Sequence, residues 1–334
     1  MKILVTGGTG FLGRRIVSEL APRHALRLLV RPGSSRERFP EGVEFAEGDV
    51  TDRASLVKAI AGCDAVVHAA ALVKILAPRE QFDRINVGGL ENVLAAAESA
   101  AAGSVERMLY VSSFMALGPT ENGPGGMLDE NSDAGDRAWI NDYERTKTLS
   151  DRLARRAVAA GAPLDVVYPG VIYGPGEMTE GNIVLRHVLD LVHGRLPGLI
   201  GKPERRWNYV YVDDVARGVA LALEKPKAGG RWVLGGENVT QGEFYGLVGR
   251  LTGAKIPTVR FPDWLAKTAG AAQKAWARLR GTTPQLTPDL VEVYRHDWAY
   301  NSAHAEKELG YRARPLAEGL ATSVAWLKES GQWR

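Results

Sequence analysis

Short apolar runs alternate with longer amphipathic segments through the first half of the chain. The runs are rich in β-branched and aliphatic residues and predict strands at Ile3–Thr6, Leu26–Arg31, Val43–Glu47, Ala65–Ala70, Met108–Ser112 and Leu164–Tyr168. Between them, periodic apolar positions predict helices at Phe11–Leu20, Ser55–Ile60, Glu80–Ala101 and Tyr143–Ala160. This alternation is typical of an α/β fold with a doubly wound parallel sheet, the Rossmann type.

The regular alternation ends after Val171. Glycine- and proline-rich turns then separate predicted helices at Ile183–His193, Asp213–Glu224 and Gln241–Thr252. We expect residues 1–171 to form a dinucleotide-binding lobe, with return segments near 207–224. Residues 172–334 should form most of a smaller, C-terminal substrate-binding lobe, and no linker separates the two, so they should be intertwined as a single unit.

Composition narrows the possible partners and location. The chain has 334 residues and a net charge of only +3, and its basic residues do not gather in a long run, so we expect a small molecule rather than a nucleic acid as partner. Cys63 is the single cysteine, and His187 and His193 lack a third ligand at a recognisable spacing, so no disulfide and no metal is expected. No apolar run approaches the roughly 20 residues of a membrane span, and a cytoplasmic location is expected.

A glycine-rich loop follows the first predicted strand and opens the first predicted helix. In such a loop Gly7 permits the tight turn, Gly10 lets the backbone approach a pyrophosphate, and Gly13 lets the helix pack closely on its strand. Thr9, Phe11 and Leu12 complete the predicted cofactor-binding loop. A glycine turn without a ligand is the alternative, but the position between strand and helix favours dinucleotide binding.

The second predicted strand ends in a basic residue, Arg31, where an NAD-selective site carries a carboxylate. Arg31 favours the 2′-phosphate of NADP, with Ser34, Ser35 and Arg36 as further donors, although NAD stays open and the basic loop could simply be solvated. After the third strand, Asp49 could accept from the adenine amino group and Val50 could cover the ring. A plain turn role for Asp49 is nearly as good an interpretation.

The chain next contains three kinds of group suited to reactions of a carbonyl: hydroxyls, a phenol and an amine. Ser112 and Ser113 end the fifth strand, at the sheet edge where ligands of open α/β sheets bind. Tyr143 and Lys147 are four residues apart and share a helix face. A carbonyl that receives hydride develops negative charge on oxygen, so Ser113 and Tyr143 suit hydrogen-bond donor and proton donor, and an ammonium at Lys147 favours the phenolate needed for the reverse direction.

Together these motifs resemble an extended short-chain dehydrogenase/reductase. The resemblance rests on Thr6–Gly13, Gly48–Asp52, His68–Ala71, Asn86-Val-Gly, Ser112-Ser113 and Tyr143-x-x-x-Lys147, and it spans nearly the whole chain. Further segments resemble the dihydroflavonol 4-reductase-like group, closest to farnesol dehydrogenase-like proteins, some of which use NAD. Hopanoid-associated proteins called sugar epimerases are also similar.

The resemblance implies a role for each matching residue. It assigns Ser113, Tyr143 and Lys147 to catalysis, Asn86 to a buried polar position supporting Lys147, and a possible homodimer to pairing of the helices at 80–101 and 143–160. It places Ala69, Ala70 and Ala71 over the adenosine side, and Pro169, Gly170 and Val171 against the nicotinamide carboxamide.

The expected substrate side of the site is apolar. Around the nicotinamide end the sequence places Leu72, Val73, Ile75, Leu76, Phe114, Met115, Met178 and Ile183, with Lys74 as the polar exception. A lipophilic alcohol or carbonyl compound, such as a terpenoid, sterol or flavonoid, therefore fits best. Two alternatives remain: an NAD-dependent nucleotide-sugar epimerase, in which Arg206 would hold a phosphate, and a non-catalytic dinucleotide-binding sensor.

Two later segments carry separate predictions. Asp213 or Asp214 should cap the helix that follows it. The basic, tryptophan-bearing segment 264–280 should be helical, and it could be a packing helix, a lid over the pocket or a peripheral membrane contact.

Overall fold

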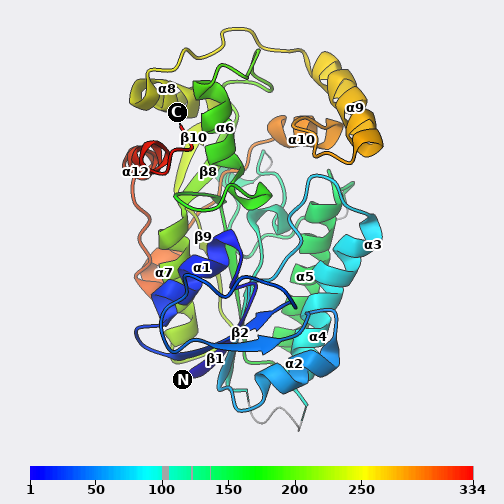
Figure 1. The fold of residues 1–334 in the computed structure, drawn as a ribbon, viewed down its shortest axis with the longest axis vertical. Coiled ribbons are helices and arrows are strands. Elements are labelled where there is room, and N and C mark those ends of the chain that lie inside the picture. The colour runs from blue at the N-terminus through cyan, green and yellow to red at the C-terminus, as the bar shows by residue number, and fades with distance from the viewer. Residues whose placement is uncertain (100–104, 122, 136, 334) are drawn as a thin grey trace.

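Two sheets organise the computed structural model, which describes residues 1–99, 105–121, 123–135 and 137–333 (Figure 1). The larger is a seven-stranded parallel sheet in the order β3-β2-β1-β4-β5-β6-β9, and the smaller a three-stranded sheet in the order β10-β8-β7. The strands are β1 (Lys2–Thr6), β2 (Ala25–Val30), β3 (Glu44–Glu47), β4 (Ala65–His68), β5 (Arg107–Val111), β6 (Leu164–Pro169), β7 (Val171–Tyr173), β8 (Arg206–Tyr211), β9 (Arg231–Leu234) and β10 (Glu237–Thr240).

Helices surround both sheets. The α-helices are α1 (Phe11–Leu20), α2 (Arg53–Ile60), α3 (Arg79–Phe82), α4 (Gly88–Ala97), α5 (Asp142–Ala159), α6 (Ile183–Val192), α7 (Val212–Glu224), α8 (Gln241–Thr252), α9 (Asp263–Arg280), α10 (Pro288–Tyr294), α11 (Ala303–Leu309) and α12 (Leu316–Glu329). A π-helical turn, η1 (Asp83–Val87), joins α3 to α4, and 3₁₀ turns occur at η3 (Phe114–Ala116), η4 (Pro124–Gly126) and η5 (Glu180–Asn182).

Alternating side chains of the larger sheet build two hydrophobic cores. Ile3 and Val5 of β1 face a core that includes residues of α1 and α7, whereas Leu4 between them faces a core that includes residues of α2, α4 and α5. A strand directs successive side chains to opposite faces, so a parallel sheet with helices on both faces needs apolar residues at nearly every position. The predicted doubly wound α/β fold is confirmed by this arrangement.

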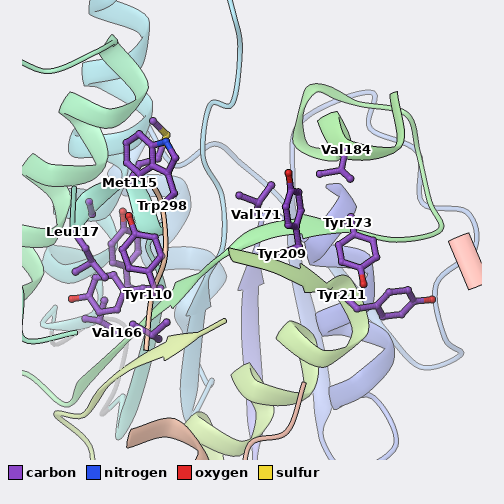
Figure 2. Packing of buried hydrophobic residues seen from close by; sticks show 14 of the residues in the cluster. Tyr110, Met115, Leu117, Val166, Val171, Tyr173, Val184, Tyr209, Tyr211 and Trp298 are labelled. Carbon is purple, nitrogen blue, oxygen red and sulfur yellow. The ribbon is translucent and has the colours of Figure 1, made fainter. Parts of the chain in front are cut away.

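The smaller sheet continues directly from the larger one. A single residue, Gly170, separates β6 from β7, and its N–H donates to Leu234 O at 3.2 Å. A Cβ at Gly170 would lie 2.3 Å from Asn208 Oδ1 of β8, so only glycine allows this approach. Buried Tyr173, Tyr209 and Tyr211 cover this sheet in Figure 2, below Val184 of α6, while Figure 1 shows α6, α8 and α12 gathered at this end of the molecule.

Most predicted elements occur within one or two residues of their expected bounds. The predicted helix Glu80–Ala101 differs, because the π-helical turn divides it into α3, η1 and α4. Its expected end at Ala101 lies outside the described residues. The extra backbone residue in such a turn redirects the helix and often marks a functional site.

The predicted capping role of Asp213 or Asp214 is wrong. Tyr211 occupies the N-cap position of α7 and makes no side-chain capping bond. Asp214 is fully buried in the first turn and accepts from the Arg314 backbone N–H at 2.8 Å, the Arg314 guanidinium and Arg217. Asp213 pairs with Arg15 at 3.3 Å. A short-range cap motif in sequence was thus outweighed by a partner 100 residues away.

Two features are absent from the described residues. No helix among them is both long and apolar enough to cross a membrane. Across the same described ranges, no three histidine, cysteine or acidic side chains gather in a way that could hold a metal ion.

Candidate active site

A cavity of about 790 Å³ lies at the carboxyl ends of the central strands of the larger sheet. Its walls come from the glycine loop, from the ends of β2, β4, β5 and β6, and from the first turns of α5. The residues predicted to bind cofactor that line it are Gly7, Thr9, Gly10, Phe11, Leu12, Gly13, Arg31, Asp49, Val50, Ala69, Ala70, Ala71, Ser112, Tyr143, Lys147, Pro169, Gly170 and Val171. Ser35 and Asn86 are not among the lining residues.

At two positions of the glycine loop only glycine fits, because a Cβ atom would collide with the backbone. Gly7 has a φ of +74°, and a Cβ there would lie 2.6 Å from Ala70 N at the end of β4. A Cβ at Gly13 would lie 2.0 Å from Gly7 O. Gly10 precedes α1 with no side chain to cap the free N–H groups, which leaves the positive end of the helix open toward the cavity. This cradle fits the pyrophosphate of a dinucleotide.

Of the basic and hydroxyl residues expected at the adenosine end, all in the loop after β2, some line the cavity and others do not. Arg31 and Ser34 line the cavity, and the Arg31 guanidinium makes no ion pair or hydrogen bond within the described parts of the chain, although the Arg31 carbonyl accepts from the Ser34 N–H at 3.0 Å. Ser35 instead accepts from the Glu37 N–H at 3.3 Å, and Arg36 pairs with Glu47. Arg31 is therefore the cation available to a 2′-phosphate.

Asp49 behaves first as a turn residue. Its Oδ1 accepts from the N–H and the hydroxyl of Thr51, both at 2.8 Å. It nevertheless lines the cavity together with buried Val50, so a turn role and contact with a ligand are compatible.

Ser113 and Tyr143 meet across the junction of β5 and α5. Ser113 lies two residues after the end of β5 and caps η3, where its Oγ accepts from the Met115 N–H at 3.3 Å. Asn141 caps α5 by accepting from the Glu144 N–H at 2.8 Å, so Tyr143 lies in the first turn and Lys147 one turn further. Burial raises the pKa of Tyr143, and a hydrogen bond with Ser113 partly opposes that rise. The phenol is therefore protonated at neutral pH.

Lys147 is buried and directed at the neighbouring strand. Its Nζ donates to Val111 O at 3.0 Å and to Tyr110 Oη at 3.4 Å. Burial lowers the pKa of Lys147 to about 7. In the described part of the chain no hydrogen bond joins Lys147 to Tyr143, and the pKa of Tyr143 is set by burial and by Ser113 without a contribution from the amine.

Asn86 holds a wall of the cavity without reaching into it. Its Oδ1 accepts from the Leu72 N–H at 2.7 Å, and its Nδ2 donates to Leu72 O at 3.3 Å and to Thr146 Oγ1 at 3.0 Å. Asn86 lies on the π-helical turn, which brings its amide between the loop after β4 and helix α5. It thus orders the segment next to Lys147 rather than contacting the amine.

His68 is buried at the end of β4 and does not line the cavity, and no role was expected for it beyond its place in the motif His68–Ala71. Its Nδ1 lies 2.7 Å from Thr6 Oγ1, and its ring stacks on Tyr110 with centroids 5.7 Å apart. Burial and the nearby Lys147 lower the pKa of His68 to about 3, so the imidazole is neutral. The available signal was a lone polar residue ending the apolar run Ala65–His68.

The substrate side of the cavity has the expected apolar side chains, and charged side chains line it as well. Lys74, Phe114, Met115 and Ile183 line it, and the Phe114 ring packs on Trp298 and Tyr300 with centroids 5.4 and 5.7 Å away. Met178 does not line it but packs against the hydrophobic core. Glycine turns around Met178 gave no indication of which way its side chain would point.

Further lining residues come from segments for which no contact with the cavity was expected, apart from 264–280, for which a lid over the pocket was one of three expectations. Glu180 of η5 accepts from the Ile75 N–H and so joins two walls. The lining residues contributed by α9, by α10 and by the residue before α10 are Lys274, Arg278, Thr287, Asp289, Leu290, Val293 and Tyr294. Only tertiary packing places these segments, which lie more than 100 residues after Tyr143, at the cavity.

Arg206 lies away from the cavity. Its Nη2 donates to Gly126 O at 2.8 Å, and it is not among the lining residues. This geometry speaks against the phosphate-binding role that an epimerase would require.

A doubly wound sheet with a glycine cradle, and with serine, tyrosine and lysine at its carboxyl edge, defines a dinucleotide-dependent α/β enzyme. Comparison with known proteins agrees. Residues 3–235 match the model of the family described as "NAD dependent epimerase/dehydratase family".

Similar proteins extend over the whole chain. A Synechocystis protein named "Putative dihydroflavonol 4-reductase" is 30% identical, over 98% of this chain and 94% of its own length. "Sterol demethylase protein B" of Methylococcus capsulatus is 29% identical, over 99% of both chains. The crystal structure of gox2253 is 33% identical with a TM-score of 0.82, over 99% of each chain.

The chain therefore belongs to the NAD dependent epimerase/dehydratase family, within the extended short-chain dehydrogenase/reductases. It is an NAD(P)-dependent oxidoreductase. The predicted family and cofactor class are confirmed, while the finer resemblance to farnesol dehydrogenase-like proteins stays a prediction.

Proposed function

We propose that this protein transfers hydride between a nicotinamide dinucleotide and a lipophilic alcohol or carbonyl compound, with Tyr143 exchanging the proton. The observation that carries the proposal is one cavity in which the glycine cradle, the Ser113–Tyr143 pair and an apolar wall meet. An apolar wall with few polar groups selects an apolar substrate and orients it by those groups.

The cofactor, when bound, supplies or takes up the hydride. In the direction of reduction, the carbonyl carbon receives the hydride and the electrons of the C=O π bond move to the oxygen. The oxygen uses that electron pair to bind the proton of the Tyr143 hydroxyl, which leaves a phenolate. The Ser113 hydroxyl donates a hydrogen bond to the same oxygen as negative charge develops there. Oxidation of the alcohol is the reverse, with the Tyr143 phenolate accepting the proton.

Lys147 has a positioning and electrostatic role in this proposal. Its amine is anchored to Val111 O and Tyr110 Oη, and Lys147 lines the cavity one helical turn after Tyr143 on α5. With a pKa lowered to about 7 by burial, it can gain or lose a proton at neutral pH. That property suits a group that returns a proton to Tyr143 after each turnover.

The substrate class follows from the pocket and from the names of relatives. Phe114, Met115 and Ile183 form its apolar side. The Synechocystis and Methylococcus relatives carry names that refer to a flavonoid and a sterol. We therefore place the substrate among terpenoid, sterol or flavonoid-like compounds, and we assign its binding mainly to residues 172–334 together with the loop after β4. The cytoplasmic location and homodimer stay predictions.

We favour NADP over NAD because Arg31 lines the cavity at the adenosine end and is free to meet a 2′-phosphate. Replacing it by alanine should lower affinity for NADP about tenfold or more, with little change for NAD. Arg36→Ala is the matched control, since Arg36 pairs with Glu47 outside the lining. Equal loss in both variants, or for both cofactors, would contradict the assignment.

The central experiment combines a cofactor titration with a substrate panel. Farnesol-like, sterol and flavonoid substrates are tested with NADP and NAD side by side, following the absorbance of the reduced cofactor. We expect turnover of at least one lipophilic class, and Tyr143→Phe should abolish it while cofactor affinity stays nearly unchanged. Undiminished activity in Tyr143→Phe would refute the proton-transfer assignment.

The same panel separates the alternatives. Conversion of a nucleotide sugar with copurified NAD and no net absorbance change would identify an epimerase. Cofactor binding without turnover of any substrate would identify a sensor.

A further inference from the structure

Helix α9 presents its large apolar side chains to solvent. Trp264, Leu265, Trp276 and Leu279 are 70%, 40%, 58% and 82% exposed. Successive residues of a helix are turned by about 100°, so these four lie on one side, together with the exposed small residues Thr268, Ala269, Ala271, Ala272 and Ala275. In Figure 1, α9 is at the outer edge of the molecule, beside α10.

Packing of α9 against the protein accounts for the small residues on its inner side but not for the large apolar residues on its outer side. Only Ala266, Gly270 and Ala277 are buried, and all three are small. A Cβ at Gly270 would lie 2.8 Å from the Thr287 carbonyl carbon, so glycine permits the close contact with the start of α10. Packing therefore accounts for the small residues and leaves two tryptophans and two leucines in water. Solvent-exposed apolar faces of this kind mark interaction sites.

Basic residues border the apolar face. Lys267 and Lys274 are held by Glu292 at 2.5 Å and Asp289 at 2.9 Å, both on α10. Arg278 and Arg280 form no ion pair within the described ranges, and the Arg280 guanidinium lies 4.6 Å from the Trp276 ring centroid. The acidic groups of the region are thus engaged on the inner side, so the outward charge is positive. An apolar face with a basic border matches an anionic lipid surface.

The same helix forms part of the cavity wall. Lys274 and Arg278 line the cavity, as does Val73 of the loop after β4, which is 41% exposed. The apolar face therefore belongs to a helix that also forms part of the cavity wall.

We propose that α9 docks on the surface of an anionic lipid bilayer, with Trp264, Leu265, Trp276 and Leu279 in the interfacial region. The helix lies on the membrane and does not cross it. Docking holds the cavity opening against the lipid, where a lipophilic substrate is concentrated; this second part rests on the proposed function, and the docking itself does not.

The test measures binding of the purified protein to vesicles. Wild type should float with vesicles of phosphatidylcholine and phosphatidylglycerol, and bind less to phosphatidylcholine alone or at high salt. Trp276→Gln and Leu279→Gln should each weaken binding at least fivefold. Trp139→Gln, which removes an exposed tryptophan outside α9, is the matched control and should bind as wild type does. Arg280→Ala should weaken binding about fivefold and reduce its salt dependence.

Other results would overturn the proposal. They are absence of wild-type binding to anionic vesicles, or equal loss in Trp276→Gln and Trp139→Gln. A second copy of the chain is the competing occupant of this face. Light scattering that shows a wild-type dimer, made monomeric by Trp276→Gln, together with no vesicle binding, would assign the face to that copy.

The docking assay and the substrate panel test separate proposals, so either proposal can be refuted while the other is retained. Vesicle binding without turnover of any lipophilic compound would retain the docking surface and refute the proposed function. Turnover of a detergent-dispersed substrate without vesicle binding would refute docking and retain the function. Neither Trp276 nor Leu279 lines the cavity, so turnover of the dispersed substrate should be unchanged in their glutamine variants.

Discussion

At the scale of single residues, the shape of the site depends on positions where a side chain cannot be accommodated. Gly13 has no Cβ because Gly7 O occupies that position, and the contact fixes the start of α1 against the turn after β1. Such close backbone approach gives the loop one shape and keeps its N–H groups in place before any ligand arrives.

Gly13→Ala should damage both stability and cofactor binding. Its Cβ would be 2.0 Å from Gly7 O, so the backbone must shift and the cradle must open. We expect a loss of roughly 2 kcal/mol in the free energy of unfolding, and cofactor affinity reduced at least tenfold. Thermal unfolding with and without cofactor measures both.

Gly246→Ala is the control for that change. Gly246 lies within α8, and the nearest atom to its added Cβ is 3.6 Å away. Alanine there should be neutral or stabilise by up to about 1 kcal/mol. If both variants behaved alike, close packing at Gly13 would not be the reason for its glycine.

Buried Lys147 should make stability depend on pH. Its pKa is about 7 in the folded protein and about 10.4 in an unfolded chain. Between these values the unfolded chain binds more protons, so the free energy of unfolding should rise as pH increases from about 7 to about 10. Below pH 7 the penalty for the buried charge is fully present.

Lys147→Met should remove this penalty. The cofactor-free variant should be more stable than wild type at neutral pH, by roughly 1–3 kcal/mol, and the difference should shrink toward pH 10. Urea unfolding across the pH range measures it. Lys58→Met, at an exposed position on α2, should keep the wild-type slope. A wild-type slope in Lys147→Met would show that another group is responsible.

At the scale of elements, the π-helical turn η1 connects a loop to a helix. Its Asn86 holds Leu72 through two hydrogen bonds and Thr146 of α5 through a third. The loop after β4 supplies much of the cavity wall, including Lys74. The geometry of that wall therefore depends on a side chain that lies behind it.

Asn86→Ala should loosen the loop after β4. Three hydrogen bonds are lost and the Leu72 N–H is left without its partner, so we expect a loss of roughly 1–3 kcal/mol in stability. Steady-state kinetics should show a larger increase in KM for the substrate than decrease in kcat. Asn92→Ala removes one 3.0 Å bond to Val50 O and should leave substrate KM unchanged. An unchanged KM in Asn86→Ala would contradict the role.

At the scale of the whole molecule, one buried carboxylate ties the C-terminal part of the chain to α7. Asp214 receives the Arg314 backbone N–H and guanidinium. The Arg314 guanidinium also lies 3.8 Å from the ring centroid of Tyr211 in the smaller sheet. This link holds the segment before α12 against α7 and the smaller sheet.

Asp214→Ala should destabilise the protein by roughly 3 kcal/mol, because it leaves Arg314 without its buried partner. Asp213→Ala is the matched control. That carboxylate is half-exposed and pairs only with partly exposed Arg15, so its loss should amount to less than about 1 kcal/mol. Chemical denaturation compares the two. Similar losses would mean that burial of Asp214 does not set its contribution.

Features fixed by short spacing were predictable from sequence. The glycine loop and the Tyr143–Lys147 pair each occupy adjacent turns, so their positions on one element follow from helix and loop geometry. His68, Glu180 and Asp289 could not be assigned, because their neighbours are distant in sequence. The direction of Met178 and the partner of Asp214 failed for the same reason: tertiary packing decided them.

The passage from β6 to β7 through Gly170 has a consequence for how ligands enter and leave. β6 of the larger sheet is followed after one residue by β7 of the smaller sheet, and that residue, Gly170, packs closely against Asn208. The two sheets are therefore rigidly connected, and we do not expect them to rotate apart about a hinge. Exchange must occur by movement of the loop after β4 and of the segment around α9. Those smaller motions, rather than rotation of whole lobes, should limit how quickly product departs.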